Sequence, residues 1–305
     1  MSAPLDPLDR MIRIGTLAGK GANTAEYVRQ ILPLGFESVQ INFWQQLGPV
    51  SLPKLAKELK PTLQQHNAVV SSLGVFGNPL GDEEIDAKTR EAWKLAVDNA
   101  AAFGTNLVCG FAGRVRNKPV PDSIAAYKKF FGPLAKRAAD KGVRIAFENC
   151  PMGGNWKTGD WNIAFNPAAW ELMFNALPDH SNIGLEWEPC HQLGQLIDPI
   201  PQLRQWIGKV FHVHGKDASV YRDVIARDGL DGPKPHFHHR HPGFGDTNWT
   251  DIISILRAAN YTSTIDIEGW HDPVYQGDLE MTGQVHALNY LKTCRGGSYV
   301  PNPTV

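Results

Sequence analysis

The chain has 305 residues, of which 42% are hydrophobic, so it can bury a large core as one large α/β domain or as two smaller ones. Its 30 basic and 31 acidic residues nearly balance, and no run of Lys or Arg occurs. This balance argues against binding to nucleic acids or membrane surfaces and favours a small molecule as the partner.

The beginning of the chain (1–20) carries acids and prolines rather than a basic segment followed by an apolar one, and no apolar run reaches the roughly 18 residues of a membrane span. We therefore expect a cytoplasmic protein. The four cysteines are widely spaced and form no C-x-x-C pair, which argues against a disulfide framework and against a thiolate zinc site. We expect them to be reduced.

Short segments rich in β-branched and aromatic residues alternate along the chain with amphipathic helical segments. The predicted strands are 12–18, 36–44, 68–77, 106–113, 144–150, 183–189, 210–217 and 262–270. The predicted helices are 24–34, 51–66, 88–103, 123–141, 167–177, 199–207, 249–259 and 280–293. Gly35, Gly104 and Gly142 each stand just before a predicted strand, as expected where a helix ends.

Strand–helix alternation predicts a parallel sheet, and eight such units in 305 residues fit a single (β/α)8 TIM barrel better than an open sheet. A dinucleotide-binding open sheet is disfavoured because the segment after the first strand, "GTLAGKGAN" (15–23), lacks the ordered G-x-G-x-x-G and is no P-loop. We predict one domain over 1–305, with 218–248 as a loop inserted over the mouth of the barrel and 295–305 as a loose tail.

Polar residues gather at the ends of the last four predicted strands, where a β/α barrel builds its active site. These residues are Glu148, Glu186, Glu188, His212, His214, Asp266 and Glu268. Six of these residues form three pairs spaced by two positions: Glu186 and Glu188, His212 and His214, and Asp266 and Glu268. Because side chains alternate along a strand, the two members of each pair share a face, and the second member lies nearer the mouth. We therefore expect Glu148, Glu188, His214 and Glu268 to converge.

Three carboxylates and one imidazole make an oxygen-rich set that suits one divalent cation. Mn²⁺ is the favoured ion, Mg²⁺ and Co²⁺ are alternatives, and Zn²⁺ suits the set less well. The competing interpretation is that these side chains are solvated rim residues paired with Lys or Arg. Four such strand ends in succession argue against it, because uncompensated buried charge is costly and a cation relieves it.

The strand-end motifs resemble those of the xylose-isomerase-like TIM-barrel sugar isomerases and epimerases, which include ketose 3-epimerases, inosose-processing enzymes and 3-keto-glycoside enzymes. The matching residues are Glu148 in "FENCP", Glu188 and His191 in "LEWEPCH", His214 in "HVHGKD", Arg240 in "RHPGFGDTNW" and Glu268 in "DIEGW". The resemblance covers most of the chain and is strongest in the last four strands. One departure is Glu188, where the family usually has Asp, which affects the coordination geometry more than the presence of the metal.

The resemblance implies a metal-dependent isomerase or epimerase that removes a proton next to the carbonyl of a keto-sugar or keto-glycoside, with the ion stabilising an enediolate. Glu148 and Glu268 match the two carboxylates that epimerising relatives place on opposite faces of the substrate, one removing a proton and the other delivering one. In a lyase the same two residues would only bind the metal, and the sequence leaves this choice open.

Six further residues are predicted to contact substrate. They are His191, Arg240, Trp44, Trp187, Trp270 and His271. The aromatic members suit the apolar C–H faces of a sugar, although a place in the core or in an interface is equally consistent with each of them. The histidine-rich segment 236–241 fits no familiar zinc spacing, so we interpret it as a loop over the barrel mouth, with one or two of its histidines touching substrate, rather than a second metal site. Lys216 and Asp217 are interpreted as structural.

Three alternatives to an epimerase remain open. A lyase, dehydratase or deglycosidase acting on a 3-keto-sugar or inosose would use the same metal site. A zinc nuclease resembling the apurinic endonucleases would need a basic face, which the near-neutral charge does not provide. A noncatalytic sugar-binding protein would leave the paired glutamates unexplained. The sequence also leaves open whether the protein forms a homo-oligomer.

Overall fold

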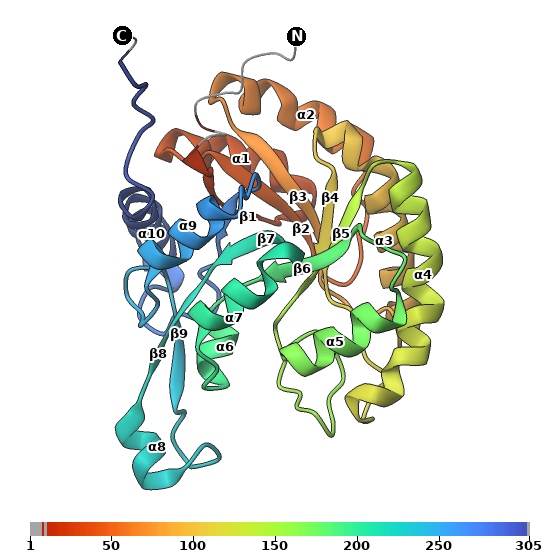
Figure 1. The fold of residues 1–305 in the computed structure, drawn as a ribbon. Helices are drawn as coiled ribbons and strands as arrows, with labels where there is room; N and C mark the ends of the chain where they lie inside the picture. The colour runs from red at the N-terminus through yellow and green to blue at the C-terminus, as the bar shows by residue number, and fades with distance from the viewer. Residues whose placement is uncertain (1–7, 9–10, 304–305) are drawn as a thin grey trace. The chain divides into compact units, whose positions relative to one another are not determined.

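The computed structural model describes residue 8 and residues 11–303. Eight strands form a closed barrel in the order β1-β10-β7-β6-β5-β4-β3-β2 (Figure 1). The barrel strands are β1 (Ile14–Ala18), β2 (Ser38–Phe43), β3 (Val69–Val75), β4 (Leu107–Gly110), β5 (Arg144–Glu148), β6 (Ile183–Trp187), β7 (Val210–Gly215) and β10 (Ile265–Ile267). The predicted fold class and all eight predicted strands are confirmed.

Helices follow the barrel strands, as predicted. They are α1 (Thr24–Ile31), α2 (Leu52–Gln65), α3 (Glu84–Asn99), α4 (Ile124–Asp140), α5 (Pro167–Ala176), α6 (Cys190–Gly194), α7 (Pro199–Trp206), α9 (Trp249–Ala258) and α10 (Glu280–Cys294). α3 begins four residues before its predicted start. The reason is a capping box, in which the backbone N–H of Glu83 donates to Asp86 at 3.0 Å while Glu83 caps the first turn.

Residue contacts divide the chain into two compact units. One comprises 17–187 and 209–212, and the other comprises the remaining described residues. The single domain over 1–305 stays a prediction, and the two units are described in turn.

In the unit formed by 17–187 and 209–212, strands β2 to β6 pair in parallel in chain order. Trp93 of α3 and Phe131 of α4 pack edge to face, with ring centroids 5.3 Å apart, and Phe131 lies 4.7 Å from Phe147 of β5. Phe147 therefore faces the helices. Because side chains alternate along a strand, the next residue, Glu148, points to the barrel interior.

In the other unit, β10 pairs in parallel with β1 and β7, and Asp266 lies in register with His214. The segment after β7 is fixed by the buried carboxylate of Asp217, which accepts hydrogen bonds from the backbone N–H groups of Ala218 (2.8 Å) and Thr247 (3.1 Å) and from the indole of Trp249 (3.1 Å). Asp217 is therefore structural, as the sequence interpretation held.

Residues 218–248, predicted to form an inserted loop, contain regular secondary structure. Strand β8 (Asp217–Val220) pairs antiparallel with β9 (Phe237–Arg240), and helix α8 (Arg222–Asp228) lies between them in the chain, at the far end of the two strands in Figure 1. We call β8, α8 and β9 the ribbon. Its strands have four residues each and pair with each other, so their alternation is too short to be identified from the sequence.

The loose tail begins later than predicted. Arg295 is 3% exposed, and its guanidinium donates to the carbonyl oxygen of Ile12 at 3.0 Å, which fixes the end of α10. Residues 299–303 have no regular secondary structure, and 304–305 lie outside the described residues.

Candidate metal centre

Three of the four predicted metal ligands come together within one unit. Glu188 directly follows β6, His214 lies near the end of β7, and Glu268 directly follows β10. One ligand atom from each lies within 4.8 Å of the others. Glu188 and His214 are fully buried, and the Glu268 side chain is 14% exposed.

Histidines lie against both carboxylates. Nε2 of His191 is 2.6 Å from Oε1 of Glu188, and Nδ1 of His214 is 3.2 Å from Oε2 of Glu268. His191 lies on the first turn of α6, three residues after Glu188, so a short strand-to-helix connection brings the two side chains together. This predicted substrate contact thus lies directly beside a predicted ligand.

Lys216 is a further member of this group that the sequence interpretation undervalued. Its ammonium lies 2.5 Å from Oε1 of Glu268, and the residue is 3% exposed. Desolvation by burial raises the pKa of Glu268, but the charge of Lys216 and the contact with His214 outweigh it and hold that pKa well below its ordinary value. Lys216 directly follows β7 and continues the two-residue spacing of His212 and His214, and that spacing was the available signal.

The donor set fits a divalent cation. Two carboxylates and one imidazole gathered within 4.8 Å give a charge that one ammonium does not balance. Carboxylate oxygens favour Mg²⁺ or Mn²⁺, and one imidazole is compatible with either ion or with Co²⁺. Glu188, His214 and Glu268 are thus the residues of this unit that could hold the ion.

Glu148, the fourth predicted ligand, belongs to the other unit. It is the last residue of β5, is 4% exposed and lies in register with Glu186. The side chain of Asn162 donates to the carbonyl oxygens of Glu148 and Cys150, both at 2.8 Å, and so fixes the backbone on either side of Asn149. The sequence interpretation missed Asn162. The role of Glu148 as a ligand stays a prediction.

A second group of donors lies in the same unit as Glu188. Cys190, His191 and His239 each offer a ligand atom within 4.8 Å of the other two. Nδ1 of His239 is 3.4 Å from the sulfur of Cys190, and the His239 ring lies 5.6 Å from that of His271. Two predicted substrate contacts, His191 and His271, therefore flank His239, a member of the segment in which the sequence interpretation expected one or two histidines to touch substrate, without saying which.

Arg240 is held in an ion pair. Its Nε lies 3.2 Å from Asp272, and its guanidinium lies 5.5 Å from the centroid of the Phe244 ring. The same carboxylate accepts from the backbone N–H of His241 at 2.9 Å. These contacts form a structural ion pair, and the predicted substrate role of Arg240 stays a prediction.

The three predicted tryptophans have different environments. Trp270 is 67% exposed, and Trp44, in the other unit, is 54% exposed and lies 5.8 Å from Trp161. Both present a ring surface that a sugar could contact. Trp187 is fully buried and alternates with Glu186 and Glu188, so it points to the opposite face of β6. The substrate role of Trp187 stays a prediction.

A third group, Cys109, Glu186 and His212, is fully buried in the unit that contains Glu148. Nδ1 of His212 donates to Oε1 of Glu186 at 2.8 Å, and the side-chain amide of Gln40 contacts the same oxygen. This carboxylate already has protein donors, which makes the group a hydrogen-bonded part of the core.

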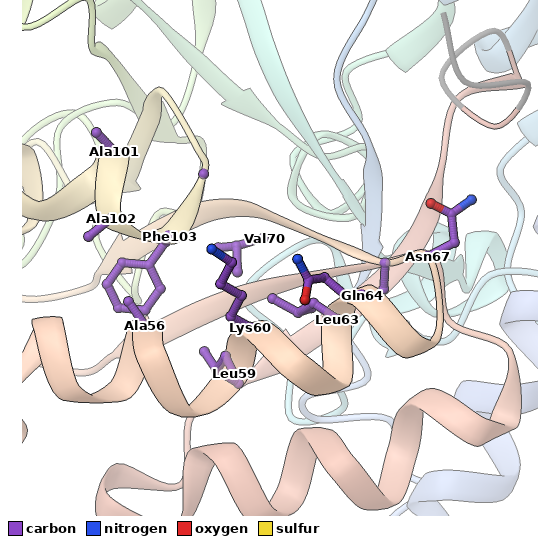
Figure 2. A pocket seen from close by; sticks show the side chains of 12 residues that line it. Ala56, Leu59, Lys60, Leu63, Gln64, Asn67, Val70, Ala101, Ala102 and Phe103 are labelled. Atoms are coloured by element: carbon purple, nitrogen blue, oxygen red, sulfur yellow. The ribbon is translucent and has the colours of Figure 1, made fainter.

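A cavity of about 510 Å³ lies elsewhere in that unit, between α2 and residues 101–104 (Figure 2). Leu59 and Phe103 contribute apolar walls, and Lys60 and Gln64 contribute polar atoms. No predicted site residue lines it.

A family model described as xylose isomerase-like TIM barrel matches residues 28–294. The chain belongs to this family. Among curated proteins, the uncharacterized protein YfiH of Bacillus subtilis (strain 168) is 25% identical over 244 residues, which cover 70% of this chain and 74% of YfiH.

Two solved structures have the same fold. The 3-keto-D-glucoside 4-epimerase YcjR from E. coli has a TM-score of 0.67 at 17% identity and covers 93% of this chain and 100% of its own. The probable 3-DHS dehydratase AsbF from Bacillus anthracis, involved in petrobactin synthesis, has a TM-score of 0.64 at 15% identity and covers 91% of this chain and 98% of its own. Within the described part of the chain, no helix is both long enough and apolar enough to cross a membrane.

Proposed function

We propose that this protein is a divalent-metal-dependent isomerase or epimerase that acts next to the carbonyl group of a keto-sugar or keto-glycoside. The observation that carries the proposal is the convergence of Glu188, His214 and Glu268 within 4.8 Å at the ends of three barrel strands. Family membership supports it, because the matched model spans these residues. The YcjR structure, which is that of a sugar epimerase, supports it by likeness of fold.

The proposed ligands are Glu188, His214 and Glu268, with Glu148 as the fourth. Glu148 is proposed because it ends β5, the neighbour of β6 in the barrel order, and points to the interior. A bound Mn²⁺ or Mg²⁺ would act as a Lewis acid on the substrate carbonyl and so acidify the adjacent C–H bond.

The protein's own residues would handle the proton. Glu268 is the proposed base, because Lys216 keeps it ionised and the contact at 2.5 Å fixes its orientation. Glu148 is proposed to return a proton from the other side of the substrate. Positioned acid–base groups of this kind typically contribute about 10²–10⁴ in rate. His191 would hold a substrate oxygen, since it is 5% exposed and lies beside Glu188.

A lyase or dehydratase is the second candidate. Its supporting observation is the Lys216 ammonium beside Glu268, because a cationic N–H group could protonate a departing hydroxyl group after the same first proton abstraction. The AsbF structure, that of a probable dehydratase, is compatible with this alternative. The zinc nuclease gains no support, since the net charge is −1.

The test is NMR spectroscopy in D₂O. Mn²⁺-loaded protein is incubated with a panel of ketoses, inososes and 3-keto-glycosides, and the metal is removed before the spectra are recorded. We expect deuterium to enter next to a carbonyl only when metal is present, and the exchange rate to fall by about 10²-fold or more in Glu268→Gln.

Glu91→Gln, a change of the same kind on an exposed face of α3, is the control and should exchange like wild type. An epimeric product identifies an epimerase, whereas loss of a hydroxyl group or an aglycone identifies a lyase. Equal exchange with and without metal would contradict the proposed function.

A further inference from the structure

The ribbon is fixed against helix α6. An added Cβ at Gly194 would lie 2.7 Å from the Phe237 ring of β9, so this glycine permits the close approach. Nε2 of His236 lies 2.8 Å from the carbonyl oxygen of Gly194 and makes a second connection. Phe237 and His239 share a face of β9, with rings 5.3 Å apart, so the packing that seats Phe237 also turns His239 toward α6.

His239 lies among residues already assigned to the candidate site. Its ring is 5.2 Å from His191 and 5.6 Å from His271, and its Nδ1 is 3.4 Å from the sulfur of Cys190. Its neighbour His238 points the other way, with Nδ1 3.1 Å from the hydroxyl of Tyr221. The strand alternation therefore delivers one histidine of the ribbon to the candidate site and keeps the next one out.

The Cys190–His239 contact pairs a thiol with an imidazole nitrogen. Desolvation by burial lowers the pKa of His239 to about 2, and the charge of Lys216 adds to this effect. A neutral imidazole has one nitrogen that accepts and one that donates, and a thiol sulfur is a weak acceptor. The S–H group is thus best used as the donor to Nδ1, which leaves the proton of His239 on Nε2.

We infer that His239 is a substrate-binding residue whose Nε2–H donates a hydrogen bond to a hydroxyl or carbonyl oxygen of the keto-sugar, and that Cys190 is a positioning residue that fixes this tautomer. The inference rests on the proposed function and adds to it a specificity element supplied by the ribbon. A neutral N–H donor suits an uncharged sugar oxygen.

The substrate half of the inference is tested with three variants on the ketose, inosose or 3-keto-glycoside that wild type turns over. His239→Phe keeps a ring but removes the donor, and KM should rise about tenfold with a smaller change in kcat. His239→Gln offers an amide N–H and should recover most of the loss. His238→Phe is the matched control on the same strand and should leave KM unchanged.

The tautomer half needs no substrate. In protein labelled with ¹⁵N-histidine, two-bond ¹H–¹⁵N correlation spectra should show His239 protonated on Nε2 in wild type and in Cys190→Ser, whose hydroxyl also donates. Cys190→Ala should show a mixture of tautomers. The His239 signals are assigned from their loss in His239→Phe.

The outcomes separate the two claims. Wild-type protein that exchanges no substrate proton contradicts the proposed function and, with it, the substrate half of the inference. Wild-type turnover with an unchanged KM in His239→Phe overturns the inference and leaves the proposed function intact. An Nδ1–H tautomer in wild type overturns the role of Cys190. A raised KM that His239→Gln restores, together with the Nε2–H tautomer, supports the inference.

Discussion

Two pairs of acid and histidine residues, two positions apart on the same strands, have different surroundings. Glu186 and His212 contact each other at 2.8 Å in a fully buried layer, where the amide of Gln40 also contacts the glutamate. Glu188 and His214 instead lie within 4.8 Å of a second carboxylate, Glu268. The inner carboxylate contacts His212 and Gln40, whereas the outer one contacts His191 and is also gathered with a second carboxylate.

The difference indicates why, of these two groups, the outer one is the better candidate metal centre. A buried carboxylate supplied with protein hydrogen bonds stabilises the fold, and a cation would have to displace those bonds. Carboxylates gathered against one another repel, and a divalent cation relieves that repulsion. Both pairs consist of a glutamate and a histidine, so the residue types alone do not distinguish a structural pair from a metal site. The neighbouring residues make the distinction.

The largest expected effect is a loss of stability when the inner pair, Glu186 and His212, is broken. Glu186→Ala removes the acceptor of His212 and Gln40 and should lower the free energy of unfolding by about 3–5 kcal/mol, because removing one partner of a buried pair leaves the others without compensation. Glu186→Gln, which keeps the volume, should cost about 1–3 kcal/mol. Urea denaturation in the presence of EDTA measures both.

Glu188→Ala, measured in the same metal-free buffer, is the comparison that matters. It also removes a buried carboxylate, but one that lies near Glu268, so relief of repulsion should offset much of the loss. A loss in Glu188→Ala as large as that in Glu186→Ala would remove the distinction between the two pairs.

The second prediction concerns metal binding by the outer group, Glu188, His214 and Glu268. Mn²⁺ at about 100 times its dissociation constant should stabilise wild-type protein by about 2.7 kcal/mol, because the ion binds the folded state. Glu188→Ala should lose most of this stabilisation, and Glu91→Gln should keep it. Thermal unfolding with and without Mn²⁺, together with the metal content after dialysis, provides the measurement. Retention of full metal content by Glu188→Ala would contradict the assignment of this ligand.

The sequence predicted the barrel and the strand ends well, for a physical reason. Buried parallel strands are continuous apolar runs, so an acid or histidine at the end of one is conspicuous, as Glu148 and Glu268 were. Alternation along the strand then predicted correctly that Glu188, His214 and Glu268 share one region.

Features that depend on contacts distant in sequence were not predictable in the same way. Lys216 was interpreted as structural because nothing in its own segment reveals that Glu268, 52 residues later, lies against it. The ribbon was missed because β8 and β9 are short, pair with each other and are separated by 16 residues in the chain, so neither strand is recognisable from its own segment. Arg240 matched a family motif, yet its partner Asp272 could be identified only from the structure.

The smallest effect extends the comparison to a third carboxylate. Asp272 is fully supplied with donors, since it accepts from the backbone N–H groups of Tyr275 (3.0 Å), His241 (2.9 Å) and Val274 (2.8 Å). Desolvation by burial raises its pKa, but these hydrogen bonds outweigh that effect and lower the pKa to about 2. Like Glu186, it should stabilise the fold rather than bind an ion.

A lowered pKa gives this contribution a defined pH dependence. The stabilisation by Asp272 is complete above the unfolded-state pKa of 3.8 and is lost as the pH falls toward the folded-state pKa of about 2. In urea denaturation, the difference in unfolding free energy between wild type and Asp272→Asn should therefore be constant from pH 7 to about pH 5 and shrink by about 2 kcal/mol between about pH 4 and pH 2. A difference that does not change over that acid range would mean that the donors around Asp272 hold its neutral form as well as its charged form. In that case proximity to N–H groups would not suffice to separate structural carboxylates from metal ligands, and the distinction would depend on the repulsion at Glu188 and Glu268 alone.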